Sequence, residues 1–109
     1  MSRDEIPPGT LYMLILKTLA RGTELHGYEI AKSVKSASED VLQVEEGSLY
    51  PALQRMLIKG WVTAKWGVTA ENRRARYYRL TVGGRKQLEA EVSQYQRVMR
   101  AIQRVISTA

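Results

Sequence analysis

The stretch GSLYPALQRMLIKG, residues 47–60, decides the fold of this 109-residue chain. Its apolar residues recur at helical spacing, Pro51 falls where a first helical turn is expected, and Gly60 marks an end. The stretch therefore predicts a helix over residues 48–59. The face opposite its apolar residues carries a hydroxyl, an amide and a guanidinium, as on a helix that enters the major groove of DNA. Ile58 also falls on this outward face.

A basic hairpin is predicted directly after this helix. Residues 61–66 and 75–80 are rich in β-branched and aromatic types, which favour strands. The polar residues between them end in paired arginines, so the two runs are interpreted as a β-hairpin with a basic tip over residues 67–76. Trp61 and Trp66 are expected to pack on the core and on a sheet face.

The flanking segments complete a winged helix-turn-helix. Helical spacing begins near Leu11 and ends at Arg21, and His26 is placed to cap a second helix that ends near residue 38. A short extended piece is expected at residues 42–45, and Thr81 caps a long last helix. We therefore predict a mainly α fold with a small β hairpin. Residues 1–80 form the winged helix-turn-helix and residues 81–109 a dimerisation helix, together one compact unit.

Composition and charge favour a cytoplasmic DNA-binding protein. The chain has no cysteine and one histidine, so it lacks the nucleophile for thiolate catalysis and the ligands for a Cys/His zinc site. No metal, cofactor or enzymatic activity is therefore expected. The longest apolar run, residues 11–16, is far below the roughly 20 residues that cross a bilayer. Residues 47–86 hold nine basic groups and one acidic group, whereas residues 1–46 have a net charge of −3. Such segregation indicates a surface that meets a polyanion.

Candidate DNA contacts follow from side-chain chemistry. The hydroxyls of Ser48 and Tyr50 and the free N–H groups of the first turn can hold phosphate. Gln54 can pair with adenine and Arg55 with guanine. The wing supplies three phosphate-binding guanidinium groups: Arg73, Arg74 and Arg76. Two structural alternatives remain open, namely a solvated helix face and a charged sheet edge that prevents aggregation.

The last helix carries an apolar seam that predicts self-association. Its apolar residues step by four and three positions, as in a coiled coil, and the helix would be roughly 37 Å long. The helix that starts near Leu11 is apolar nearly all round. A second copy of the chain is expected to cover the seam of the last helix and the apolar surface of this first helix. The predicted dimerisation residues are Leu11, Leu14, Ile15, Leu88, Val92, Tyr95, Met99, Ile102 and Ile106.

Several motifs resemble the PadR family of bacterial transcriptional regulators. They are LHGYEI at residues 25–30, EEGSLYPAL at 45–53, KG at 59–60 and RYYRLT at 76–81, in the family's order. The resemblance covers roughly residues 9–92, and GSLYP is its most specific piece. The short C-terminus resembles the subgroup with a single helix after the winged domain. Ile58 departs from the pattern, because the family usually carries polar or acidic residues there.

The resemblance implies a homodimeric repressor of an inverted-repeat operator in double-stranded DNA. It places Ser48, Tyr50 and Pro51 at the start of the recognition helix, Tyr28 against the DNA backbone, and the three arginines in the wing. It also implies release by a small-molecule effector in some members. An alternative from a different class is a winged-helix module that binds an acidic protein partner.

Overall fold

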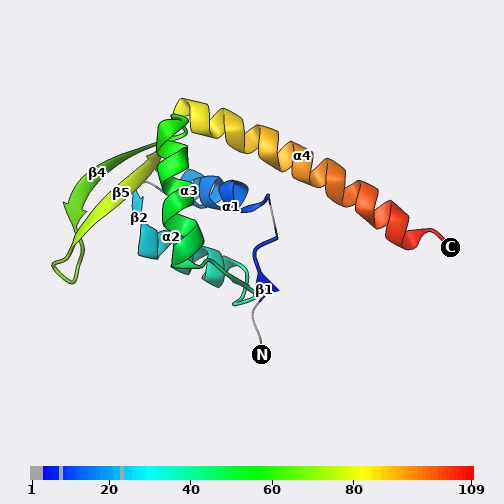
Figure 1. The fold of residues 1–109 in the computed structure, drawn as a ribbon, viewed down its shortest axis with the longest axis horizontal. Helices are drawn as coiled ribbons and strands as arrows, with labels where there is room; N and C mark the ends of the chain where they lie inside the picture. The colour runs from blue at the N-terminus through cyan, green and yellow to red at the C-terminus, as the bar shows by residue number, and fades with distance from the viewer. Residues whose placement is uncertain (1–3, 8, 23) are drawn as a thin grey trace.

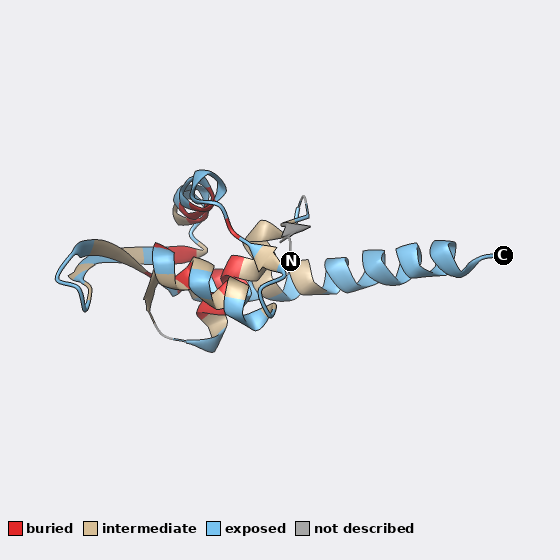
Figure 2. Cartoon of the chain, turned by 90° about the horizontal axis from the view of Figure 1, so that it is seen from below, coloured by how far each residue is buried: buried red, intermediate tan, exposed pale blue. Residues whose placement is uncertain are grey.

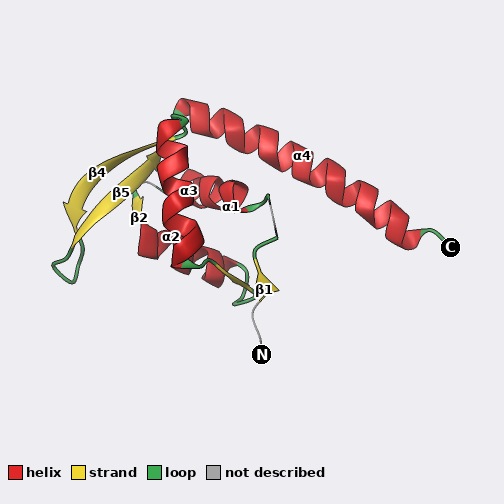
Figure 3. Ribbon diagram, viewed as in Figure 1, coloured by secondary structure: helices red, strands yellow, loops and turns green. Residues whose placement is uncertain are grey.

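The computed structural model describes residues 4–7, 9–22 and 24–109, and Figure 1 shows the path of the chain. The elements are β1 Asp4–Glu5, α1 Leu11–Arg21, β2 Leu25–His26, α2 Gly27–Ala37, β3 Leu42–Gln43, α3 Glu46–Ile58, β4 Val62–Val68, β5 Arg74–Leu80 and α4 Val82–Ser107. Helices dominate and the strands form small sheets (Figure 3). The predicted mainly α winged-helix fold is confirmed.

The wing is part of a three-stranded antiparallel sheet in the order β2-β5-β4. The hairpin of β4 and β5 was expected, but the pairing of β2 with β5 was not. A two-residue strand has no periodicity of its own, and Leu25 and His26 were interpreted as the approach to a helix cap. β3 also pairs with β1, in parallel, although no strand was predicted at Asp4–Glu5.

The core lies where three helices meet the base of the sheet. Its fully buried side chains include Ile15 and Leu16 of α1, Ile30 of α2 and Leu53 of α3. Figure 2 shows the buried parts of the chain gathered in the body of the molecule, whereas the far part of α4 is exposed along its length. The molecule therefore extends to 57 Å along its longest axis.

Helix α3 begins earlier than predicted. It starts at Glu46 instead of residue 48, because the carbonyl of Glu45 accepts the backbone N–H groups of Ser48 and Leu49 at 3.0 and 2.9 Å. Pro51 consequently lies inside the helix and not in its first turn. Since proline has no N–H to donate, the helix lacks the bond to the carbonyl of Gly47.

The start of α4 packs closely on Trp61, the residue directly before β4. Thr81 caps α4 as expected: its hydroxyl accepts the N–H of Gly84 at 2.9 Å and donates to the carbonyl of Gly60 at 2.7 Å. A Cβ on Gly84 would lie 2.1 Å from the carbonyl oxygen of Trp61. The glycine, a poor helix former, is present because the backbone of Trp61 occupies the space of a side chain.

Candidate DNA interface

A groove between the wing and the helices gathers most of the predicted contact residues. It has a volume of about 960 Å³ and runs from α2 and α3 to β4 and β5; we call it the wing groove. Six of the nine predicted DNA-binding residues line it: Tyr28, Tyr50, Gln54, Arg73, Arg74 and Arg76. Lys32 and Trp66 also line the wing groove and were not among the predicted site residues. Lys32 could have been found from its spacing, one helical turn after Tyr28.

The two tyrosines reach the wing groove from the starts of α2 and α3. Tyr28 is 67% exposed and Tyr50 is 47% exposed, so both side chains are accessible to a partner. Gly27 makes room for Tyr50, because a Cβ on Gly27 would lie 2.7 Å from Cε1 of that ring. The close approach of α2 to α3 thus fixes where the Tyr50 ring lies.

The inner face of the wing changes from apolar to cationic toward its tip. Strand pairing sets Ala64 opposite Tyr78 and Trp66 opposite Arg76, all on the same face. Tyr78 is buried in the core, and this burial raises its pKa above the usual 10. Beyond Tyr78, the guanidinium carbons of Arg74 and Arg76 lie 4.6 and 5.7 Å from the centre of the Trp66 ring. Trp66 is 58% exposed, so it lies on the face of the sheet and not in the core.

The outer face of the wing has part of its charge compensated. Glu24 accepts from Arg79 Nη2 at 3.2 Å and lies 3.2 Å from Lys65 Nζ, so one carboxylate serves two cations. Arg74 and Arg76 on the inner face have no ion pair in the described part of the chain. The larger uncompensated positive charge of the two strands therefore faces the wing groove.

Helix α3 presents different chemistry on its two flanks. Gln54 lines the wing groove, but Arg55 lies on the other flank, where its Nε donates to the hydroxyl of Tyr12 and its guanidinium lies over the same ring. Arg55 thus links α3 to α1. Ser48 and Pro51 are exposed on α3 but are not among the residues that line the wing groove.

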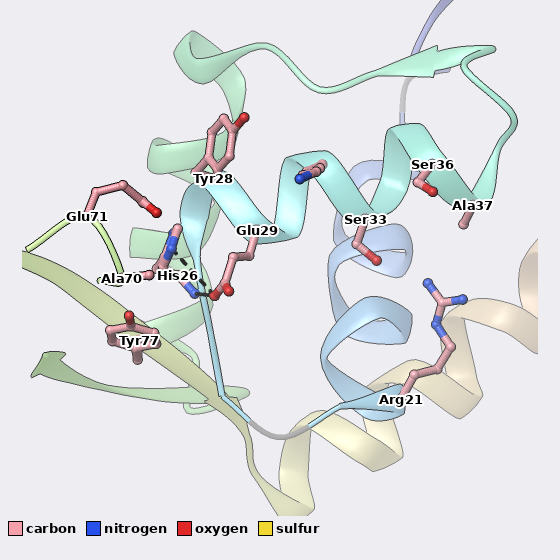
Figure 4. A pocket seen from close by; sticks show the side chains of 11 residues that line it. Arg21, His26, Tyr28, Glu29, Ser33, Ser36, Ala37, Ala70, Glu71 and Tyr77 are labelled. Carbon is pink, nitrogen blue, oxygen red and sulfur yellow. Dashed lines mark hydrogen bonds and ion pairs between the residues drawn. The ribbon is translucent and has the colours of Figure 1, made fainter. Parts of the chain in front are cut away.

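A second, more polar pocket of about 630 Å³ adjoins the wing groove (Figure 4). Here Glu29 accepts the backbone N–H of His26 at 3.0 Å, which confirms His26 as the cap of α2. The His26 ring stacks on Tyr28, with centroids 6.3 Å apart, and meets Tyr77 edge-on at 5.3 Å. This cluster holds the start of α2, and with it Tyr28, against the wing.

The predicted dimerisation residues differ in how accessible they are. Ile15 is fully buried in the chain's own core, so its side chain cannot reach a second copy and its assignment to an interface is wrong. The seam of α4 is exposed: Tyr95, Met99, Ile102 and Ile106 have 40–68% of their surface accessible. Leu14, Leu88 and Val92 line an apolar hollow of about 650 Å³ between α1 and α4. Leu11 is half-buried beside the core.

No cluster of three or more potential metal ligands occurs among the described residues. None of the helices in this part of the chain has the length and apolar character to cross a membrane.

Comparison with known proteins agrees with this geometry. A chain from Clostridium thermocellum, solved as a transcriptional regulator, superposes with a TM-score of 0.80 at 26% identity and covers 88% of this chain and 92% of its own. A PadR family transcriptional regulator from Eggerthella lenta has a TM-score of 0.78, also at 26% identity. The match covers 93% of this chain and 85% of that one. An uncharacterized protein from Lysinibacillus sphaericus is 28% identical over 94% of this chain and 93% of its own length.

A family model matches most of the folded body. The model for the transcriptional regulator PadR-like family aligns with residues 15–90, which include α2, α3 and the whole wing. The motifs in the sequence, the winged-helix architecture and this match lead to one assignment. The chain belongs to the PadR-like family of transcriptional regulators.

Proposed function

We propose that this protein is a homodimeric repressor that binds an inverted-repeat operator. Helix α3 enters the major groove of DNA, and the wing contacts the adjacent backbone or the minor groove. The observation that carries the proposal is the wing groove, which Gln54 of α3 lines together with Arg74 and Arg76, two guanidinium groups that have no ion pair with a carboxylate among the described residues. One amide that can read a base thus lies beside cations that can hold phosphate.

Duplex binding at varied salt tests the proposal. If the dimer neutralises about eight phosphates, the logarithm of affinity should fall with the logarithm of salt concentration at a slope of about −7. Selection from random duplexes should then return an inverted repeat with half-site centres about 34–36 Å apart. A protein that shifts no duplex in dilute buffer, and instead binds an acidic protein, would be the interaction module described above.

The exposed seam of α4 supports the homodimer. Its apolar residues repeat at coiled-coil spacing over the exposed half of the helix, where the chain's own core does not reach. An uncovered stripe of this length is costly in water, and a second α4 carries the complementary surface. Sedimentation equilibrium measures the oligomeric state directly, and a monomer at micromolar concentration would contradict the proposed homodimer.

We place the effector site in the hollow between α1 and α4. Leu14, Leu88 and Val92 make it largely apolar, and it lies beside the proposed dimer seam, so a small apolar ligand there would contact the surfaces that set the spacing of the two wings. A naphthalene sulfonate dye is a suitable probe. It should gain fluorescence on binding and lower duplex affinity; binding of the dye without loss of duplex affinity contradicts the assignment.

A further inference from the structure

The indole of Trp66 is the centre of a small cluster on the inner face of the wing. Arg76 is its cross-strand partner, and Arg74 lies diagonally opposite, nearer the hairpin tip. Both guanidinium groups are within cation–π range of the ring, at 4.6 Å for Arg74 and 5.7 Å for Arg76. Trp66 keeps 58% of its surface exposed, so burial does not account for a large apolar residue here.

The ring is the contact that holds these two guanidinium groups. Neither makes a side-chain hydrogen bond or an ion pair with any residue that the structure describes, and Nε of Arg76 is buried without a partner. Arg79 on the outer face of the wing is held differently, by the carboxylate of Glu24. A carboxylate on the inner face would neutralise the charge that phosphate needs, whereas an aromatic ring orients a cation and leaves its charge intact.

A cation–π contact need not consume the donors of an arginine, because the N–H groups of a guanidinium lie in its plane and point outward. Nε of Arg76 is buried, so its terminal N–H groups are the ones left for a phosphate. An arginine that is already oriented loses less conformational freedom when it binds phosphate. Two oriented arginines side by side can therefore bind one DNA strand at a smaller entropic cost than two mobile ones.

We propose that Trp66 is a positioning residue for DNA binding, which orients Arg74 and Arg76 toward the phosphate backbone and makes no base contact itself. This inference rests on the proposed function, because it assigns a role within the same DNA surface. The role of Trp66 follows from the distances between its ring and the two guanidinium groups, which are independent of the charge distribution that supports DNA binding.

The experiment uses the full chain and a mixed-sequence duplex at low salt. Trp61→Phe first leaves Trp66 as the only tryptophan, because the chain has two. In this background, Trp66→Leu should lower duplex affinity roughly tenfold, and Trp66→Phe should restore part of the loss. Fluorinated tryptophans weaken the attraction of the ring for cations with little change of shape, so affinity should fall in steps as fluorine atoms are added.

A third arm separates positioning from direct contact. In a chain that also carries Arg74→Ala and Arg76→Ala, the Trp66→Leu change should have no further effect. A further loss in that chain would mean that the ring touches DNA and would overturn the inference, as would equal affinity across the fluorinated series. If the parent protein binds no duplex, the proposed repressor function fails first, and this outcome is distinct from the other two.

Discussion

Gly27 has no side chain because the ring of Tyr50 occupies the place where one would lie. Gly27→Ala should therefore displace Tyr50 from its position in the wing groove and weaken duplex binding several-fold. The stability loss should be small, since the far end of a flexible side chain can move. Gly22→Ala is a matched control, because a Cβ there meets nothing within 4 Å. Equal duplex affinity of the two variants, measured by fluorescence anisotropy, would contradict the role given to Gly27.

The two neighbouring glycines of α4 should respond in opposite directions. Gly84→Ala forces a Cβ against the backbone carbonyl of Trp61, which cannot rotate away, and should destabilise the protein by about 1–3 kcal/mol. Gly83→Ala meets its nearest atoms at 3.6 Å and should stabilise by about 0.5 kcal/mol through helix propensity. Urea denaturation measures both. A Gly84→Ala protein as stable as the parent would exclude the close packing described here.

The chemistry of individual residues could be predicted from the sequence better than the direction in which their side chains point. Gln54 and Arg55 both fall on the polar side of α3, and helical geometry alone separates them by 100°. The structure shows that this angle matters: Gln54 lines the wing groove and Arg55 reaches back to Tyr12 of α1. No pattern within α3 encodes where α1 lies, so the link between Arg55 and Tyr12 could not be predicted.

At the scale of elements, α3 and the wing should contribute differently to binding. Gln54→Ala removes a group that can pair with a base and should cost about 1–3 kcal/mol on the selected operator and little on random DNA. Arg74→Ala removes a phosphate contact from each copy of the dimer and should weaken both duplexes alike, with the magnitude of the salt slope reduced by about 2. Titration of each variant with operator and random duplex tests the assignment. Equal losses on both duplexes for Gln54→Ala would contradict it.

The helices and the wing strands were predictable because each carries a long pattern. Apolar spacing marked α1, α2 and α3, and alternation with aromatic residues marked β4 and β5. β1 and β2 were missed because each is only two residues long and exists through pairing with a distant strand. The predicted beginning of α3 was two residues too late. Pro51 was taken to lie in the first turn of the helix, whereas the first hydrogen bonds of the helix are accepted by the carbonyl of Glu45.

At the scale of the whole molecule, the seam of α4 should control the oligomeric state. Ile102→Glu puts a charge in the middle of the proposed dimer contact and should shift the protein to monomer in sedimentation equilibrium. Ala101→Glu introduces the same side chain one position away, off the seam, and should leave the dimer intact. Dissociation of both variants, or of neither, would argue against a contact along this face of the helix.

The two proposed functional surfaces lie at opposite ends of the elongated molecule, with the wing at one end and the exposed part of α4 at the other (Figure 1). Either surface can therefore be damaged while the other is preserved. A copy without Arg74 and Arg76 would still associate with an intact copy and would give a mixed pair with one competent wing. For the homodimeric repressor that we propose, the defective copy would be a dominant-negative inhibitor in a cell that produces both forms, and a modest excess of it would derepress the target gene.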